Sequence, residues 1–413
     1  MSEVATREPQ LRFPEFSDSL IKGALGDYAL IKRGAGSQYI EYSKDSKDSK
    51  DSIRLIRIGD FLGGDAVFVR LTNAIQRFLL DEGDILIAGT GATAGITFLV
   101  PTKFVGMAYS YNAPKIKVHK DNVSFFYQYL ISPKIKIQQI RLFTGNAQPF
   151  LDTNAIKGFS IFKPPLQEQQ KIAAFLTAVD NKIEQLSKKQ ALLGEYKKGL
   201  MQKIFSQAIR FKADDGSDFP DWEDGLLNTL IDNSRKIRYG IVQPGKYDKN
   251  GKYLIRGKDY SNGWEIPSEF FKVSDAIEKK YSKTRVKKGD VIVCIVGSVG
   301  NVMVIPGWLD GANITQTTAR IAPDKNKLNN QYLYFYFQSL VGRNMIHKHT
   351  RVGTRPGLNI EDVEKFSILL PSLLEQAKIA NFLSSIDNKI EQVGKQLDES
   401  KQFKKALLQQ MFV

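Results

Sequence analysis

Residues Ile161–Leu186 read IFKPPLQEQQKIAAFLTAVDNKIEQL, and residues Ile368–Val393 read ILLPSLLEQAKIANFLSSIDNKIEQV. The two stretches are identical at 16 of 26 positions and lie 207 residues apart, half of the 413-residue chain. Self-similarity at a fixed offset indicates an internal repeat, which decides the architecture. We therefore predict a tandem duplication in which a globular domain and then a long helix occur twice.

Three shorter pairs of similar segments lie outside the helices and support the same duplication. They are Phe13–Phe16 with Phe219–Trp222, Leu55–Arg57 with Leu254–Arg256, and Gly83–Ile87 with Gly289–Val293. The helical stretches are nearly alike, whereas the globular parts share only such framework residues. This unequal divergence is expected of two domains that read different targets on one scaffold.

The repeated stretches carry the signals of helix starts. Pro164 and Pro165 precede the first helix and Pro371 the second, which suits proline because it is tolerated at and before the first helical turn. Glu168 and Glu375 fall in that first turn, where a negative charge is favourable to the helix dipole. Both helices are therefore predicted to begin within a few residues of these prolines.

Apolar residues then recur with a 4-3 spacing, which is typical of a coiled-coil seam. The residues predicted to pair the helices are Ile172, Leu176, Val179, Ile183, Leu186, Ile379, Leu383, Ile386, Ile390 and Val393. Polar seam residues at Gln190, Lys197 and Lys404 would lower stability but fix the register. The matched registers favour pairing of the two helices over two separate helices, each on its own domain. Short connections favour an antiparallel pair, with one globular domain at each end, over a parallel pair. About 43 residues at 1.5 Å each would give a rod of at most about 65 Å.

The fold class predicted from these patterns is α+β, with two mixed α/β domains and two long helices related by an internal pseudo-two-fold. The domain bounds are 1–163 for the first globular domain, 164–207 for the central helix, 208–370 for the second globular domain and 371–413 for the C-terminal helix. Strands are predicted at Arg54–Ile58, Asp84–Ala88, Tyr253–Arg256, Asp290–Val296 and Asn301–Ile305, and short helices at Phe125–Ile131 and Gln331–Gln338.

The charge balance points to an acidic partner. The chain has 59 Lys and Arg against 44 Asp and Glu, a net charge of +15, which favours nucleic acid over a protein that is merely basic. A single cysteine, Cys294, excludes an intrachain disulfide framework. The His347–His349 pair has no nearby residues to complete a metal-ligand set, so a solvated or phosphate-contacting pair is favoured.

The sequence also bears on where the protein works. The first ten residues, MSEVATREPQ, lack the apolar core of a signal peptide. The longest apolar stretch, Val291–Pro306, is interrupted by polar residues and glycines and is too short to span a bilayer. We therefore expect a cytoplasmic protein with no membrane partner.

Basic and aromatic residues interleave in several loops of the globular domains, a mixture that suits phosphate contact and base-edge reading. The candidate DNA-binding residues are Arg33, Arg57, Tyr109, Tyr111, Asn112, Asn146, Gln148, Arg235, Lys236, Arg238, Tyr239, Lys258, Thr315, Gln316, Thr317, Arg351, Thr354 and Arg355. For each single residue, an exposed structural role remains an alternative. Residues Ser43–Ser52, SKDSKDSKDS, are predicted to form a disordered surface loop.

Catalytic motifs are absent from the sequence. Residues Ala88–Gly95, AGTGATAG, resemble a dinucleotide or adenosylmethionine loop, but no acidic residue ends a following strand, so a glycine turn between strands is favoured. No phosphate loop, HExxH motif or Asn/Asp-Pro-Pro-aromatic motif occurs. We therefore predict a non-catalytic binding protein. Scattered acidic pairs leave a self-sufficient nuclease open as an alternative.

This arrangement resembles the DNA-specificity subunit of type I restriction-modification systems. The resemblance covers the whole chain and rests on the motif PxLxEQxKIAxFLxxxDxKIExx, which occurs at Pro164–Leu186 and again at Pro371–Val393. It implies two target recognition domains that read the halves of a bipartite, asymmetric site in double-stranded DNA. It also implies paired helices that set the spacer and dock two modification subunits, with restriction subunits joining them.

The resemblance further implies that this subunit is not itself catalytic and holds no cofactor. Adenosylmethionine would bind to the modification subunits, and ATP and magnesium to the other partner subunits. The main alternative is a non-catalytic coiled-coil adaptor that binds protein or RNA through its basic surfaces. An adaptor would show no preference among DNA duplexes, and a nuclease would cut DNA alone with magnesium.

Overall fold

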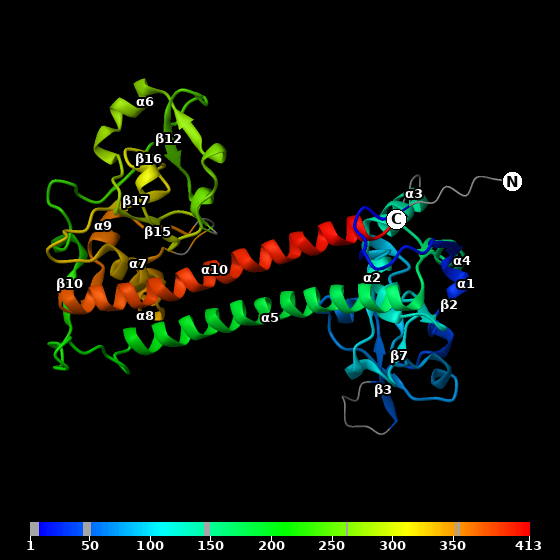
Figure 1. The fold of residues 1–413 in the computed structure, drawn as a ribbon. Coiled ribbons are helices and arrows are strands. Elements are labelled where there is room, and N and C mark those ends of the chain that lie inside the picture. The colour runs from blue at the N-terminus through cyan, green and yellow to red at the C-terminus, as the bar shows by residue number, and fades with distance from the viewer. Residues whose placement is uncertain (1–7, 44–50, 144–148, 262, 352, 354–355) are drawn as a thin grey trace. The chain divides into compact units, whose positions relative to one another are not determined.

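The computed structural model describes residues 8–43, 51–143, 149–261, 263–351, 353 and 356–413. It divides the chain into two compact units. Unit 1 comprises Met1–Lys188 with Gly394–Val413, and unit 2 comprises Lys189–Val393. Each unit holds one of the globular domains together with a part of both long helices, α5 (Leu166–Phe205) and α10 (Leu373–Met411) (Figure 1).

Unit 1 contains three small sheets. The strands, in the order in which they neighbour one another, are β1 (Ile21–Ala24) and β9 (Ser160–Lys163); β2 (Ala29–Lys32), β8 (Lys115–Val118), β5 (Ile85–Ile87) and β6 (Thr97–Leu99); and β4 (Phe68–Arg70), β3 (Ser52–Ile56) and β7 (Ala108–Tyr109). All of these pairs are antiparallel except β3 with β7, which is parallel. The parallel pair brings the carboxyl ends of two strands to one edge, where the candidate site lies.

Unit 2 repeats these sheets strand for strand. Its strands are β10 (Glu223–Leu226) and β18 (Ser367–Leu370); β11 (Arg238–Tyr239), β17 (Thr318–Ile321), β14 (Val291–Cys294) and β15 (Val302–Val304); and β13 (Phe271–Val273), β12 (Lys252–Ile255) and β16 (Asn313–Ile314). Again one pair, β12 with β16, is parallel. The duplication predicted from the helices therefore extends to the topology of the globular domains.

Three of the shorter helices also correspond between the units: α2 (Val123–Leu130), α3 (Pro133–Phe143) and α4 (Thr153–Lys157) in unit 1 match α7 (Asn330–Gln338), α8 (Leu340–His349) and α9 (Ile360–Glu364) in unit 2. The other two do not correspond, because α1 (Leu25–Tyr28) lies between β1 and β2 and α6 (Asp275–Lys280) lies between β13 and β14. Asparagine caps both α2 and α7: Asn122 Oδ1 accepts from Phe125 N at 2.9 Å, and Asn329 Oδ1 accepts from Tyr332 N at 3.0 Å. The predicted short helices and strands are present, with ends that differ by one or two residues.

The glycine-rich segment at 88–95 is a turn between β5 and β6, as favoured from the sequence. Gly91 and Gly95 have φ values of +75° and +86°, in the left-handed region that favours glycine. Residues 44–50 of the SKD repeat lie outside the described residues.

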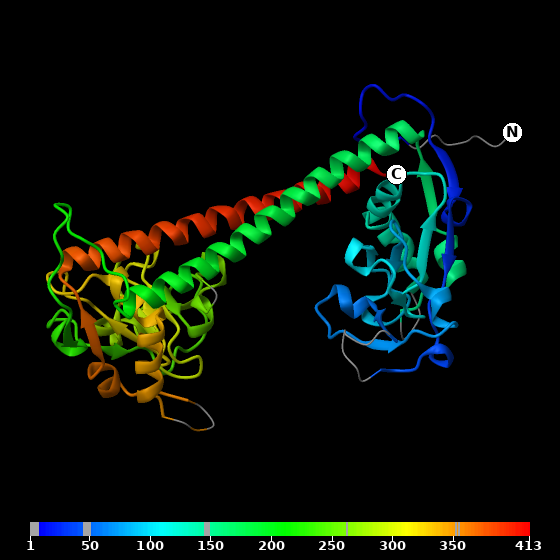
Figure 2. The same cartoon turned by 90° about the horizontal axis from the view of Figure 1, so that it is seen from below.

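The core of unit 1 is completed by the end of the chain. Leu407, Met411 and Phe412 are buried beside Ile172 and Leu176 of α5. The last turns of α10, red in Figures 1 and 2, lie against α2. Along this contact the two long helices run in opposite directions, since the later residues of α10 meet the earlier residues of α5.

The core of unit 2 is completed in the corresponding way by the end of α5. Met201, Ile204 and Phe205 are buried beside Ile379 and Leu383 of α10. Of the ten predicted seam residues, seven are buried and Val179, Ile183 and Ile390 are partly buried. Each globular domain therefore packs on the beginning of its own helix and on the end of the helix from the other half of the chain.

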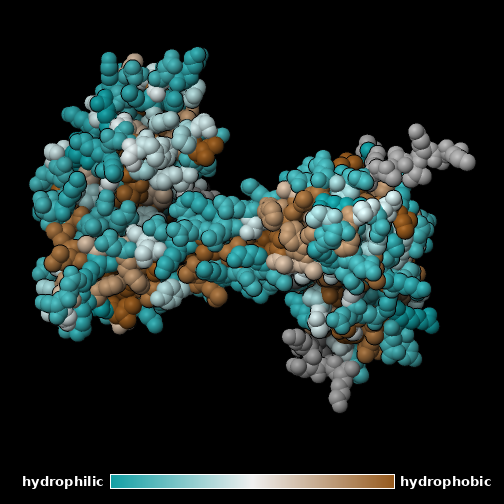
Figure 3. Space-filling model, in the orientation of Figure 1, coloured by the Kyte–Doolittle hydropathy of each residue, from teal (hydrophilic) through white to brown (hydrophobic). Residues whose placement is uncertain are grey.

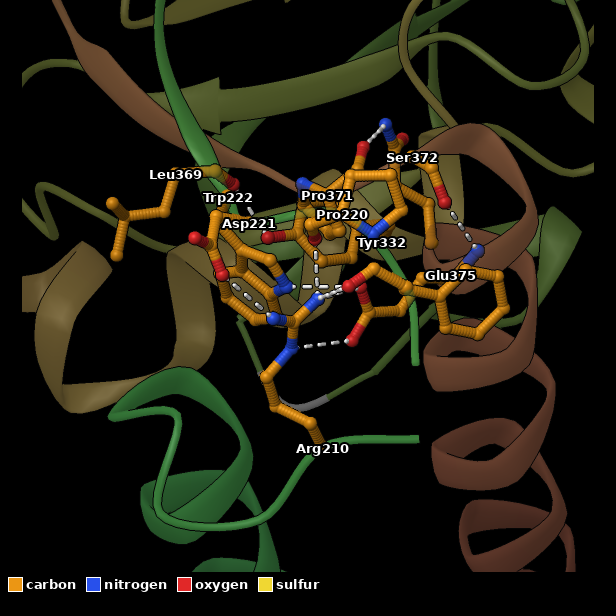
Figure 4. A network of polar contacts seen from close by, with 11 residues as sticks. Arg210, Pro220, Asp221, Trp222, Tyr332, Leu369, Pro371, Ser372 and Glu375 are labelled. Atoms are coloured by element: carbon orange, nitrogen blue, oxygen red, sulfur yellow. Dashed lines mark hydrogen bonds and ion pairs between the residues drawn. The ribbon is translucent and has the colours of Figure 1, made fainter. Parts of the chain in front are cut away.

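Buried carboxylates fix the start of each long helix. In unit 2, Glu375 is 0% exposed and accepts hydrogen bonds from Arg210 Nη2 at 2.8 Å and from Trp222 Nε1 at 3.0 Å (Figure 4). In unit 1, Glu168 is paired in the same way with Arg12, whose Nη2 lies 2.7 Å from Oε2. The hydrogen bond to Glu168 raises the pKa of Arg12. These ion pairs tie the segment that precedes each globular domain to the first helical turn after it.

Candidate nucleic-acid interface

The candidate site of unit 1 is a recess of about 690 Å³, called recess 1 below. It is lined by Ala35, Gly36, Ser37, Gln38, Ile40, Tyr42, Leu55, Arg57, Ile58, Thr90, Thr93, Ser110, Tyr111 and Asn112. Backbone hydrogen bonds hold its walls together. Ala35 N donates to Tyr109 O at 2.8 Å, Tyr111 N donates to Ala35 O at 2.9 Å, and Ser110 N donates to Ile56 O at 3.0 Å. The loop after β2 therefore lies against the carboxyl ends of the parallel strands β3 and β7.

The backbones approach so closely here that one position requires glycine. A Cβ atom at Gly34 would lie 2.2 Å from Tyr109 O. In unit 2, a Cβ atom at Gly240 would lie 1.7 Å from Ile314 O. Gly34 directly follows the predicted site residue Arg33, and Gly240 directly follows Tyr239. These matched glycines mark the close backbone approach at each site, and they can be seen in the sequence.

Recess 1 brings together three of the predicted residues, Arg57, Tyr111 and Asn112, and its lining includes no acidic residue. Arg33 lies beside them, with its guanidinium carbon 4.4 Å from the ring centre of Tyr111 and 5.2 Å from that of Phe150. Buried nitrogen atoms of Arg33 (Nη1) and Arg57 (Nε) have no hydrogen-bond partner among the described residues. The recess is thus a concave surface with cationic, amide and hydroxyl groups, which suits the edges of bases and phosphate oxygens.

Tyr109 corrects the predicted set. Its side chain is 1% exposed, its ring packs edge-on to Phe78, and burial raises the pKa of its hydroxyl. The hydroxyl reaches the backbone oxygen of Arg33 at 3.4 Å. Tyr109 therefore supports recess 1 from within the core and cannot contact DNA in this conformation.

Unit 2 builds the same backbone arrangement with different side chains. Ile241 N donates to Ile314 O at 2.7 Å and Gln316 N donates to Ile241 O at 3.0 Å, matching the bonds around Ala35. By this match, Tyr239 takes the place of Arg33, Gln316 that of Tyr111, and Thr317 that of Asn112. The predicted residues Arg238, Tyr239, Lys258 and Gln316 are exposed. The hydroxyl oxygens of Thr315 and Thr317 lie 2.9 Å apart and are partly buried.

Arg235 also corrects the predicted set, because it has a structural role. Its Nη1 lies 2.6 Å from Oδ1 of the buried Asp290, and its side chain is 17% exposed. Lys236, its neighbour, is exposed. Neutralising Arg235 would leave a buried carboxylate without its partner, so Arg235 is not a simple phosphate contact.

The sequence prediction missed residues at both sites. Arg256 occupies in unit 2 the position of Arg57, and both backbone N–H groups donate to an aspartate three residues later: Arg57 N to Asp60 Oδ2 and Arg256 N to Asp259 Oδ2, at 2.8 Å each. The repeated Leu-Ile-Arg segment was the available signal. Gln38, Tyr42, Thr90 and Thr93 also line recess 1, and no sequence pattern marks them.

Of the remaining predicted residues, the structure describes only Arg351. Arg351 has a side chain that is 70% exposed, with Nη2 at 3.8 Å from Asp362. The others, Asn146, Gln148, Thr354 and Arg355, lie outside the described residues. Among the described residues, no group of three or more His, Cys, Asp or Glu residues is placed to hold a metal ion. In the same ranges, no helix is both long enough and apolar enough to cross a membrane.

Comparisons with known proteins agree with this geometry. A family model described as "Type I restriction modification DNA specificity domain" matches residues 26–193 and 231–400, so each unit carries most of one copy. The Type I restriction enzyme MjaVIII specificity subunit of Methanocaldococcus jannaschii is 27% identical over 83% of this chain and 80% of its own length. The EcoBI specificity subunit of Escherichia coli is 27% identical over 69% of this chain and 64% of its own length.

Solved structures show the same fold. The S subunit of a type I restriction-modification system from M. genitalium aligns over 98% of this chain and 99% of its own, with a TM-score of 0.60 and 15% identity. A chain from a structure of a type I R-M system aligns over 94% of this chain and 96% of its own, with a TM-score of 0.57 and 20% identity. The doubled family match, the duplicated topology and the two matched sites lead to one conclusion: the chain belongs to the DNA specificity subunits of type I restriction-modification systems.

Proposed function

We propose that unit 1 and unit 2 each read one half of a bipartite, asymmetric site in double-stranded DNA. The observation that carries this proposal is the matched backbone of the two sites with different side chains on it. Arg33, Tyr111 and Asn112 in unit 1 correspond to Tyr239, Gln316 and Thr317 in unit 2. Because base discrimination depends on the donors and acceptors that side chains present, two such surfaces would prefer different sequences.

The long helices would set the length of the unread spacer between the half-sites by pairing as an antiparallel coiled coil. Two matched ion pairs support this pairing. Lys404 Nζ lies 2.5 Å from Asp180 Oδ1 in unit 1, and Lys197 Nζ lies 2.6 Å from Asp387 Oδ1 in unit 2. Both lysines are polar seam positions, and a seam charge that finds its partner in only one alignment specifies the register.

The helices also offer surfaces to modification subunits. Tyr196 and Phe403 lie 207 positions apart on α5 and α10, and their side chains are 55% and 53% exposed. In unit 1, a groove of about 650 Å³ has Ile137, Ile183 and Leu408 among its lining residues. We propose that two modification subunits dock at these helices and supply the adenosylmethionine-dependent chemistry, with restriction subunits adding ATP-dependent steps.

An exchange of recognition domains tests the proposal. Residues Asp214–Leu369 would be replaced by the corresponding segment of another specificity subunit, and methylated sites would be mapped in cells that also carry the modification subunit. We expect one half of the methylated site to change while the other half and the spacer remain. A change in both halves would contradict independent reading. A wild-type chain with no preference among duplexes would instead favour a non-catalytic adaptor.

A further inference from the structure

One strongly charged surface has no counterpart in the other unit. The segment between β13 and β14, residues 274–290, contains six basic and three acidic residues. The corresponding segment between β4 and β5, residues 71–84, contains one basic and three acidic residues. The flanking strands of the two units correspond here, but the segment of unit 2 contains α6 and that of unit 1 a single turn of 3-10 helix, so the segments differ in local structure and in charge.

Two of the three carboxylates of the basic segment are already engaged with arginines. Glu278 pairs with Arg285, and Asp290 pairs with Arg235. Five exposed lysines remain, and within the described part of the chain none of them forms an ion pair: Lys279, Lys280, Lys283, Lys287 and Lys288. Hydrophilic side chains gather over this region, at α6, in Figure 3. Like charges so close together repel one another unless an anion lies over them.

A buried arginine joins this segment to a second basic loop. Arg320 is 2% exposed, and its Nη1 donates to the backbone oxygens of Lys283 at 3.0 Å and Arg285 at 3.1 Å. Its Nη2 donates to the backbone oxygen of Lys236 at 2.7 Å. The backbone beneath Lys283 is therefore held by Arg320, which also holds Lys236, two residues before Arg238 in β11.

We propose that Lys236, Arg238, Lys279, Lys280, Lys283, Lys287 and Lys288, the basic face of unit 2, bind the phosphate backbone of duplex DNA beside the half-site that this unit reads. This inference rests on the proposed function and adds a contact that carries no sequence information. Lysine is a compact point charge that neutralises phosphate without selecting a base. The counterpart segment of unit 1 has Asp81, which accepts from Lys117 at 2.6 Å, so unit 1 has no such face at this place.

The test uses the full chain assembled with modification subunits and the variant Lys283→Gln/Lys287→Gln/Lys288→Gln. Each lost phosphate contact lowers the slope of log affinity against log salt by about 0.9, so three contacts lower it by up to about 2.7. Raising the salt concentration from 50 to 200 mM weakens the binding of both proteins. The factor by which binding weakens should be up to about 40 times smaller for the variant than for the wild type. Specific and non-specific duplexes should weaken by the same factor, and the methylated sequence should stay the same.

A matched triple variant in unit 1, Lys22→Gln/Lys120→Gln/Lys157→Gln, removes the same charge from exposed positions and should keep nearly the wild-type slope. An unchanged slope in the unit 2 variant would overturn the proposal, and so would a changed methylated sequence, because the face would then read bases. Both outcomes are distinct from failure of the proposed function, which would appear as a wild-type complex without any preferred site.

Discussion

The burial of the C-terminal end in the core of unit 1 gives a sharp prediction about stability. Phe412 is 3% exposed, and its ring centre lies 4.8 Å from that of Tyr129 and 5.6 Å from that of Phe125. Truncating a buried phenylalanine costs about 3–5 kcal/mol of unfolding free energy. We expect a loss of at least about 3 kcal/mol for Phe412→Ala.

The matched position in unit 2 is Phe205, which is 1% exposed and packs against Tyr332 and Tyr336. Phe205→Ala should destabilise unit 2 by a similar amount, while the exposed Phe403→Ala should change stability by less than about 0.5 kcal/mol. For a unit of this size, a loss of about 3 kcal/mol lowers the melting temperature by roughly 6–12 °C.

Hydrogen exchange read by mass spectrometry separates the two units. Phe412→Ala should lower the protection of α2 and leave that of α7 nearly unchanged, and Phe205→Ala should do the opposite. If Phe412→Ala left α2 fully protected, or lowered the protection of α7 instead, the C-terminal end would not belong to the core of unit 1.

Two further predictions concern pH and helix length. The hydrogen bond from Arg285 lowers the pKa of Glu278 below its ordinary value of 4.5, so its stabilising effect is present at neutral pH and is lost as the pH falls through the folded-state pKa. Glu278→Gln should therefore lower the melting temperature at pH 7 and reduce the further loss on acidification below pH 4.5, as measured by thermal unfolding across that range. Adding seven residues after both Lys189 and Gln396 keeps the 3.5-residue seam in phase and lengthens each helix by about 10 Å. The spacer in the methylated site should then grow by up to about three base pairs, and an active variant with the original spacer would show that the helices do not set it.

The long helices could be predicted closely because their signals are local. The 4-3 spacing of apolar residues and the prolines before each helix placed α5 and α10 within two residues of their observed ends. What the spacing could not show is which globular domain receives each helix end. The burial of Phe412 beside Tyr129 depends on residues nearly 300 positions apart, and no pattern near either of them reveals it.

The candidate site was harder to predict because its residues come from separate segments of the chain. They meet in the folded structure but follow no common sequence pattern. The predicted residues Arg57, Tyr111 and Asn112 line recess 1, and their contact with DNA stays a prediction. The interleaving of basic and aromatic residues also selected Tyr109, because a buried tyrosine and an exposed tyrosine cannot be told apart in the sequence. It also selected Arg235, whose partner Asp290 lies 55 residues away.

The central proposal is that recess 1 and the matched site of unit 2 each read one half of the DNA site. Its most direct test maps methylated sites in cells that carry the modification subunit with either Asn112→Ala or Gln316→Ala, two exposed residues at the two sites. Removing one base contact costs about 1–3 kcal/mol of discrimination, which is a 5- to 150-fold loss at the affected position. We predict that Asn112→Ala relaxes one half of the site, that Gln316→Ala relaxes only the other half, and that the spacer is the same in both. Relaxation of the same half by both variants would contradict the account.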